Sequence, residues 1–203
     1  PDMDKRRQML RLGLDTLGME TSALTEHENG TLHVRFKVGM AMLFEEGQTA
    51  PLNDSLCAET LRNRRSQFID DIGTHQEYLI SGMVKAWKLR AFVCAPIWVG
   101  SEIYGTLTFY DRRLRHHTFS EEDKVFVELL AAWFGKVLFE QHQHKILETM
   151  AMTDSLTGLP NRLHFKEQIT DALERAARDG AVPAVCFIDL DEFKTVNDTL
   201  GHL

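Results

Sequence analysis

Two acidic residues stand at alternate positions near the end of the chain, directly after an apolar run. Residues 184–190 form a run of strand length with the β-branched Val185 and the aromatic Phe187, which favours a buried strand. In such a strand the carboxylates of Asp189 and Asp191 would point the same way. Carboxylates at a strand end can hold Mg²⁺ against nucleotide phosphates. The residues alone leave a second interpretation open, a strand end with two solvated acids.

Two motifs give this pair a context. DSLTGLPNR occupies residues 154–162, and FIDLDEFKTVNDTLGH occupies residues 187–202, with a helix-length segment between them. Together they resemble the opening of a GGDEF domain, the catalytic module of diguanylate cyclases, which join two GTP molecules into cyclic di-GMP. The resemblance implies that Asp154 and Arg162 belong to a signature that helps fix how a linker meets the domain.

The resemblance also implies roles for positions in the second motif. Asp189 would be a Mg²⁺ ligand, together with the backbone carbonyl of Leu190. Phe193 and Lys194 would lie in the turn that approaches the GTP phosphates, and Asn197 would hydrogen-bond the guanine base. These residues are the expected Mg²⁺ and GTP site.

The sequence departs from the family where the printed residues end. The GG[DE]EF loop, which in this family supplies a further metal-binding carboxylate, is absent from the 203 residues. Phosphoryl transfer with two metals works by positioning and charge neutralisation, so a partial ligand set should not support it. We expect a longer parent protein to be a diguanylate cyclase and the chain as given to be inactive.

Composition and charge narrow the class of protein. Hydrophobic residues make up 43% of the chain and charged residues 26%, as in ordinary globular domains. A formal charge of −7 argues against a nucleic-acid-binding surface, and no apolar run reaches membrane-spanning length. The three cysteines Cys57, Cys94 and Cys186 are far apart in sequence, which fits a reducing cytoplasm.

The first two thirds of the chain alternate between helical and strand patterns. The Asn29-Gly30 turn indicates a hairpin, and Ser120 with Asp123 resembles a capping box that opens a long helix towards Met150. The order predicts an α+β fold with an antiparallel sheet. We expect helices at 2–19, 55–61 and 121–152 and a helical or irregular segment at 76–89. We expect two strands within 21–38, around the turn Glu28-Asn29-Gly30, and further strands at 40–44, 67–69, 92–99 and 103–110.

This region carries a second resemblance. PLNDSLCAETL, APIWVGSEIYGTLTFYD and FSEEDKVFVELLAAWFG occur in the order found in GAF domains, which are ligand-sensing modules often placed before GGDEF domains. The resemblance covers roughly residues 3–142. It implies a GAF-like sensor domain at 1–148 and a partial α/β GGDEF domain at 149–203, joined by a long linker helix.

A GAF-like fold suggests a pocket between the sheet and residues 44–88. A covalently attached bilin is not indicated, because no cysteine is followed by His, and the sequence identifies no other ligand. The competing interpretation of every candidate is plain hydrophobic core. The candidate lining residues are Phe44, Leu52, Cys57, Ile69, Tyr78, Trp87, Cys94 and Phe109.

We therefore expect a cytoplasmic, dimeric signalling protein in which a GAF sensor controls a diguanylate cyclase. The alternative is a non-catalytic module whose degenerate GGDEF domain is a receptor for GTP or cyclic di-GMP. A homodimer would pair helix 121–152 of two protomers, because its apolar residues surround more than one face. The expected heptad seam is Phe126, Leu130, Trp133, Val137, Glu140, His144, Leu147 and Ala151.

Overall fold

The computed structural model describes most of the chain. It covers residues 2–40, 44–79, 81–115, 117–154 and 156–180, the side chains of 2–4 excepted. Beyond residue 180 it describes residues 182, 184–186, 188, 189, 191, 192, 194, 198, 199 and 201. The chain separates into two compact units, Pro1–His144 and Lys145–Leu203, where we expected 1–148 and 149–203.

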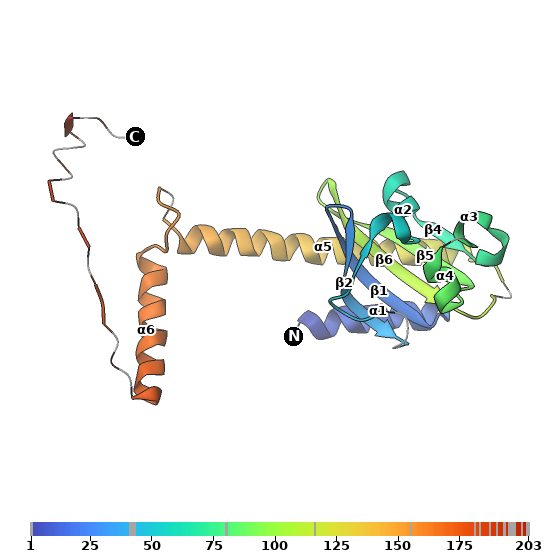
Figure 1. Cartoon of the computed structure of the whole chain (residues 1–203), viewed down its shortest axis with the longest axis horizontal. Coiled ribbons are helices and arrows are strands. Elements are labelled where there is room, and N and C mark those ends of the chain that lie inside the picture. Colours follow the sequence, from blue (N-terminus) through green and yellow to red (C-terminus); the bar gives the residue numbers. More distant parts are fainter. Residues whose placement is uncertain are drawn as a thin grey trace. The chain divides into compact units, whose positions relative to one another are not determined.

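The first unit is built on a six-stranded antiparallel sheet with the order β3-β2-β1-β6-β5-β4 (Figure 1). Helices and strands alternate as a GAF-like sequence predicts, so the expected α+β class is confirmed. The strands are β1 (Thr21–Glu28), β2 (Thr31–Gly39), β3 (Thr49–Pro51), β4 (Gln67–Ile69), β5 (Ala91–Val99) and β6 (Glu102–Asp111). The helices of this unit are α1 (Asp2–Leu17), α2 (Ala58–Asn63), α3 (Gln76–Leu79), α4 (Gly82–Trp87) and α5 (Glu121–Met152), whose residues from Lys145 on belong to the second unit. Short 3₁₀ turns lie at Leu52–Asp54 and Ile72–Thr74.

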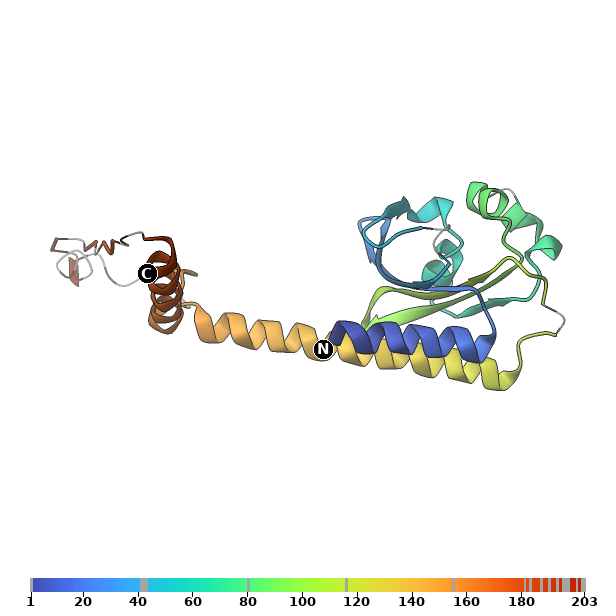
Figure 2. The ribbon, with the colours of Figure 1, turned by 90° about the horizontal axis from the view of Figure 1, so that it is seen from below.

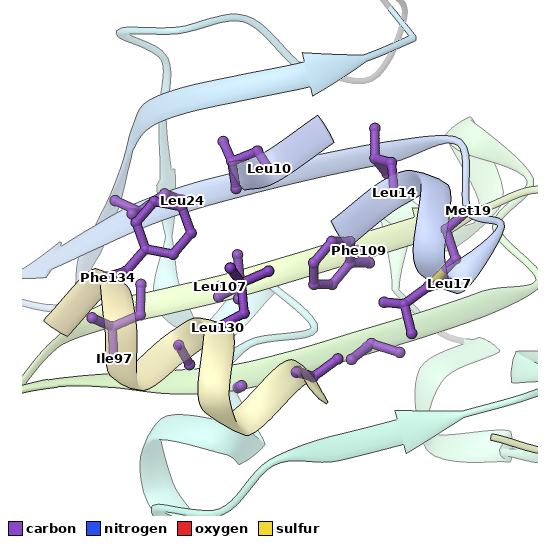
Figure 3. Packing of buried hydrophobic residues seen from close by; sticks show 14 of the residues in the cluster. Leu10, Leu14, Leu17, Met19, Leu24, Ile97, Leu107, Phe109, Leu130 and Phe134 are labelled. Carbon is purple, nitrogen blue, oxygen red and sulfur yellow. The ribbon is translucent and has the colours of Figure 1, made fainter. Parts of the chain in front are cut away.

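Each face of the sheet is covered by a separate hydrophobic core. Helices α1 and α5 lie side by side under one face (Figure 2), and Leu10, Leu130 and Phe134 pack there against Leu107 and Phe109 (Figure 3). The segment from α2 to α4 covers the other face. Its core contains Leu56, Cys57, Ile72, Val84, Phe92, Cys94 and Tyr110.

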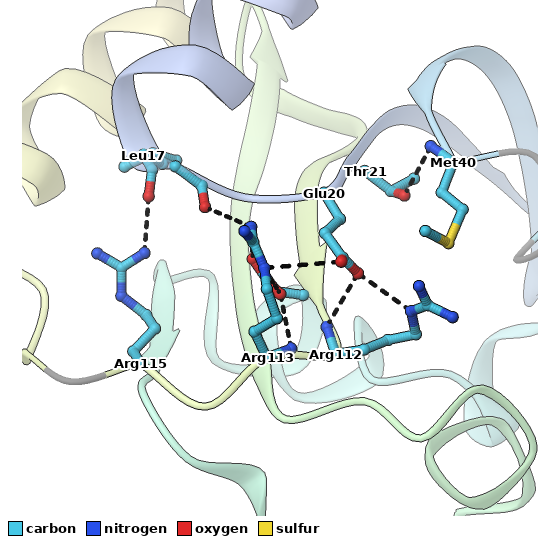
Figure 4. Close-up of polar contacts among 9 residues, drawn as sticks. Leu17, Glu20, Thr21, Met40, Arg112, Arg113 and Arg115 are labelled. Atoms are coloured by element: carbon cyan, nitrogen blue, oxygen red, sulfur yellow. Dashed lines mark hydrogen bonds and ion pairs between the residues drawn. The ribbon is translucent and has the colours of Figure 1, made fainter.

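Arginines after β6 tie the end of α1 to the sheet (Figure 4). Arg115 donates to the carbonyl of Leu17 at 2.7 Å, and Arg113 donates to that of Gly18 at 2.9 Å while it pairs with Asp111 at 2.8 Å. Carbonyls at a helix C-terminus lack partners within the helix and carry partial negative charge. The two guanidinium groups therefore satisfy these acceptors and hold α1 in place.

Local sequence signals predicted several elements correctly. Asn29 and Gly30 have φ of 49° and 78°, as the tight hairpin turn requires. The capping box is confirmed, since Asp123 N donates to Ser120 Oγ at 3.1 Å and Ser120 N donates to Asp123 Oδ2 at 2.9 Å. The short strand at 67–69 and the hairpin of β5 and β6 are also confirmed.

The prediction of a strand at 40–44 is wrong for the two residues of this segment that the structure describes. Met40 and Phe44 lie outside any strand, residues 41–43 fall outside the described part, and the third strand is β3 at Thr49–Pro51. Met40 N instead donates to Thr21 Oγ1 at 3.2 Å, which closes the end of the first hairpin. Pro51 is tolerated in β3 because this strand lies at the edge of the sheet.

Helix α5 faces the sheet in a register that the heptad pattern did not predict. Leu130, expected at the seam, is 3% exposed and packs in the core of its own unit. The outward positions lie one residue earlier, where Val125 is 54%, Leu129 66% and Phe139 41% exposed. The sequence pattern could not separate these two apolar stripes, because the difference depends on how the helix lies on the sheet.

In the second unit, the DSLTGLPNR motif forms the joint between α5 and α6 (Arg162–Asp179). Asp154 accepts hydrogen bonds from the amides of Leu156 at 3.2 Å and Thr157 at 2.9 Å, which closes a tight turn. Asn161 caps α6, because its Oδ1 accepts from the amides of Leu163 and His164 at 3.0 Å.

The strand expected at 184–190 is not formed in the part of this segment that the structure describes. Residues 184–186, 188 and 189 have no regular structure and are exposed. A strand needs a neighbouring strand for its amides and carbonyls. The described residues of the second unit contain no strand that could pair with it, and hydrophobic patterning alone does not supply one.

Gly135 is required where α5 approaches the sheet. A Cβ there would lie 2.1 Å from the carbonyl oxygen of Trp98, beside the register shift between Ile97 and Trp98. We expect Gly135→Ala to lower the free energy of unfolding by about 2 kcal/mol, because the helix must move away from the strand. Urea denaturation measures this. Gly82→Ala, where a Cβ would meet nothing within 4 Å, is the matched control; equal stability of the two variants would contradict the close approach.

The joint loop should depend on pH through Asp154. Hydrogen bonds from the Thr157 amide and hydroxyl lower the pKa of Asp154 below its ordinary value of 3.8. The loop is thus fully stabilised above that value and loses this contribution as pH falls through the lowered pKa. NMR titration of the carboxyl should give a midpoint below 3.8, and Thr157→Val should raise it. An unchanged midpoint in the variant would contradict this arrangement.

Candidate functional site

A cavity of about 130 Å³ lies between the sheet and the segment from α2 to α4. Its walls come from β1, β2, β3, β6, α4 and the turns between them. Among the residues that the structure describes, none with a charged side chain lines it, so the cavity suits a small uncharged ligand. The lining residues are Thr25, Leu32, Val34, Phe44, Gln48, Thr49, Ala50, Ser55, Cys57, Met83, Trp87 and Tyr110.

Three aromatic rings give the cavity a shaped wall. The ring centroids of Phe44 and Trp87 are 5.6 Å apart, and those of Phe44 and Tyr110 are 5.5 Å apart and nearly perpendicular, at 72°. Phe44 also has the ammonium of Lys37 5.8 Å from its ring centroid. A flat apolar group would find edge and face contacts here.

Two cysteine thiols lie at the base of the same core. Thr106 Oγ1 donates to Cys57 Sγ at 3.5 Å, and the Tyr110 hydroxyl lies 4.0 Å from that sulfur. Contact with Cys94 and these hydroxyls lower the pKa of Cys57. Burial raises the pKa of Cys94 and of Tyr110.

A chain of polar side chains runs beside the thiols. Thr60 Oγ1 donates to Gln67 Oε1 at 2.8 Å, Gln67 Nε2 donates to the Tyr78 hydroxyl at 2.8 Å, and that hydroxyl donates to Glu59. Burial and the neighbouring Glu59 carboxylate raise the pKa of Tyr78, so this hydroxyl stays protonated. The chain links a fully buried threonine to a partly exposed carboxylate.

The structure brings together most of the residues expected in the pocket. Phe44, Cys57 and Trp87 line the cavity. Leu52, Ile69, Tyr78 and Cys94 belong to the same core without lining the cavity, which fits the competing interpretation of these four as core.

Phe109 is the exception and corrects our expectation. It lies in the core formed with α1 and α5 on the opposite face of the sheet (Figure 3). Its neighbour Tyr110 lines the cavity instead. Because successive side chains alternate, one side of β6 carries Thr106, Thr108 and Tyr110, and the other carries Leu107 and Phe109. Thr108 pairs with Cys94, so counting every second residue from this pair could have predicted Tyr110 for the cavity side.

A wider depression lies at the end of α1, and two arginines that line it are held by carbonyls of the fold. It has a volume of about 700 Å³ and is lined by Asp111, Arg113 and Arg115, among others. Both arginines donate to carbonyls at the C-terminus of α1. This depression therefore has a structural explanation, and the aromatic cavity remains the better candidate for ligand binding.

The expected Mg²⁺ and GTP residues are only partly described. Asp189, Asp191 and Lys194 are described and exposed, whereas Leu190, Phe193 and Asn197 fall outside the described residues. Among the residues that the structure covers, no group of three or more possible metal-ligating side chains occurs. The carboxylates of Asp189 and Asp191 are nevertheless the hard oxygen ligands that Mg²⁺ prefers.

Comparison with solved structures shows the fold of the first unit. The GAF domain from an Acinetobacter phosphoenolpyruvate-protein phosphotransferase superposes with a TM-score of 0.57 and 14% identity, covering 71% of this chain and 85% of that one.

Among the described residues, no helix is long and apolar enough to cross a membrane.

Curated relatives match different portions of the chain. A diguanylate cyclase of Escherichia coli (strain K12) is 29% identical over 97% of this chain and 59% of its own length. A cyclic di-GMP phosphodiesterase of Pseudomonas aeruginosa is 51% identical over 30% of this chain and 8% of its own length. The chain thus spans less than two thirds of the length of either relative.

Family models match the two parts of the chain separately. The GGDEF model, described as diguanylate cyclase, GGDEF domain, matches residues 151–203. The GAF domain model matches residues 7–138, which is most of the chain and the unit that holds the sheet and the cavity. This protein belongs to the GAF domain family, and its GAF domain is followed by a GGDEF domain sequence.

Proposed function

We propose that the protein to which this chain belongs is a GAF-regulated diguanylate cyclase that condenses two GTP molecules to cyclic di-GMP. The observation that carries this proposal is the GGDEF match at residues 151–203, directly after the helix α5 that begins in the GAF unit. The similarity to a diguanylate cyclase over nearly the whole chain supports it. The three cysteines and the need for GTP favour the cytoplasm as its compartment.

In this proposal Asp189 and the carbonyl of Leu190 hold Mg²⁺, which neutralises charge on the GTP phosphates. Phe193 and Lys194 lie in the turn that approaches the phosphates, and Asn197 binds the guanine base. The oxygen chemistry of Asp189 and its neighbour Asp191 suits this metal. The aromatic cavity is the proposed place where the GAF domain takes a small uncharged ligand.

Removal of the Asp189 carboxylate should stop catalysis. In the full-length protein, Asp189→Ala should lower kcat at least about 100-fold, because the metal loses a ligand where charge develops. Cyclic di-GMP formation from GTP and Mg²⁺ is measured by chromatography. The exposed Asp171 on α6 supplies the matched control, Asp171→Ala, which should retain activity. Asn197→Ala should mainly raise KM. Near-normal turnover of Asp189→Ala would reject this metal site.

We also propose that the protein acts as a homodimer through α5. Each GGDEF domain would hold one GTP, so two domains must meet for one reaction. The exposed positions Val125, Leu129 and Phe139 form an apolar stripe on α5 that its own sheet does not cover. A second copy of the same stripe is a self-complementary partner under two-fold symmetry. This stripe replaces the seam through Leu130 that the sequence predicted.

The outward stripe can be tested without nucleotide. Leu129 is 66% exposed, so Leu129→Glu should leave the fold intact and weaken the dimer by burying a charge at the interface. Sedimentation at micromolar concentration should then show a monomer. The control is Leu79→Glu on α3, at a leucine that is 40% exposed and far in sequence from the stripe. A wild-type monomer, or a dimer that survives Leu129→Glu, would reject the α5 interface.

The second candidate function is a non-catalytic receptor for GTP or cyclic di-GMP. The similarity of part of this chain to a cyclic di-GMP phosphodiesterase favours considering it. The residues that follow Leu203 in the parent protein distinguish the two. An intact GG[DE]EF sequence supports the cyclase, and a degenerate one supports the receptor.

A further inference from the structure

Two buried cysteines have no role in the proposed cyclase. Cys57 precedes α2 and Cys94 lies in the middle of β5, and their exposed fractions are 1% and 0%. They belong to the same hydrophobic core, and Cys57 Sγ lies against Thr106 and Tyr110, which flank Thr108, the residue that pairs with Cys94 in the sheet. A pair of adjacent thiols from two different elements has a chemistry that a single buried cysteine lacks.

The surroundings of the pair are polar on one side. Thr106 Oγ1 donates to Cys57 Sγ at 3.5 Å. The Tyr110 hydroxyl lies 4.0 Å from Cys57 Sγ. Hydroxyl donors stabilise a thiolate over a thiol, so Cys57 is the better placed of the two thiols to act as the nucleophile.

One thiol of the pair borders a space that a small molecule can occupy. Cys57 lines the aromatic cavity of about 130 Å³, whereas a single water takes about 30 Å³ in the liquid, so a molecule of the size of hydrogen peroxide fits.

We propose that Cys57 and Cys94 are a redox-sensitive pair, which a small hydroperoxide entering the cavity oxidises to a disulfide. The Cys57 thiolate attacks one peroxide oxygen, an S–O bond forms, the O–O bond breaks, and the leaving oxygen takes the proton that the Cys57 thiol released on ionising and departs as water. The Cys94 sulfur then attacks the Cys57 sulfur. An S–S bond forms, the S–O bond breaks, and the second oxygen leaves as water with the proton of Cys94. The two sulfurs are oxidised and the peroxide is reduced to two waters.

The disulfide would join the start of α2 to β5 at the wall of the cavity. Cys57 lines the cavity together with Tyr110 and Phe44, so a covalent link on Cys57 constrains the same wall that a ligand contacts. Oxidation would thus change ligand binding by the GAF domain. The chemistry itself does not depend on cyclase activity, so it can fail or succeed separately from the proposed function.

The pair can be tested on the chain described, with Cys186→Ser as background because Cys186 is exposed and would form links between molecules. The protein is treated with hydrogen peroxide, denatured, alkylated and mapped by mass spectrometry without reductant. We expect the intact mass to fall by that of two hydrogen atoms, and one linked peptide pair to contain Cys57 and Cys94. Dithiothreitol should restore both thiols.

Variants distinguish a tuned pair from accidental oxidation. Thr106→Val should slow the reaction about threefold to tenfold, since the hydrogen bond that favours the Cys57 thiolate is lost. Thr170→Val, at an exposed hydroxyl on α6 outside the cavity, should leave the rate unchanged. Cys57→Ser and Cys94→Ser should each abolish the linked peptide; circular dichroism checks their fold, and the wild-type map stands without them. Two alkylated cysteines after peroxide, or separate sulfinic acids, would overturn the proposal.

Discussion

The sheet of the GAF unit is buried on both faces, and this constraint organises everything attached to it. Along β5 and β6 each residue must suit one of two different environments, because successive side chains point to opposite sides. Phe109 fills the core under α1 and α5, and its neighbour Tyr110 fills the core with the cavity. Burying a ring of this size stabilises the fold by about 2 kcal/mol. A shift of register by one residue would exchange the two sides of the strand, and each core would lose its buried ring.

The buried face of the sheet also determines which side of helix α5 faces inward. Its inward side needs Gly135 for close approach and Leu130 and Phe134 for packing, and this fixes the rotation of the helix about its axis. Once the rotation is fixed, Val125 and Leu129 must face outward. The apolar stripe on α5 is therefore a consequence of the packing and cannot be read from the helix alone.

The parts of the fold that the sequence predicted depend on short-range chemistry. The hairpin turn at Asn29-Gly30 and the cap at Ser120 need only neighbouring residues, and both were predicted correctly. Errors arose where distant contacts decide. Pairing at the edge of the sheet makes Thr49–Pro51 the third strand in place of residues 40–44. Packing on the face of the sheet determines which apolar residues of α5 are buried. Residues 184–190 have the composition of a strand, but the described residues of their unit offer no strand to pair with.

The candidate sites follow the same division. Cys57 could be predicted to lie near a pocket because the motif PLNDSLCAETL placed it, and Trp87 because it lies in the segment 44–88. Phe109 could not be assigned to a face without the register of β6.

The ends of α5 show how a signal could pass along it. At the start, Asp70 Oδ1 accepts from the amide of Phe119 at 2.8 Å, which holds the entry to the helix against the end of β4. At the other end, Asn161 Nδ2 donates to the carbonyl of Ala151 at 2.7 Å while its Oδ1 caps α6. One asparagine therefore joins the last turn of α5 to the first turn of α6. Because an α-helix resists twisting through its hydrogen bonds along its length, a rotation at residues 145–152 must carry the start of α6 with it. In the proposed cyclase, a movement of residues 145–152 would thus reach the GGDEF sequence through a joint that its own signature motif builds.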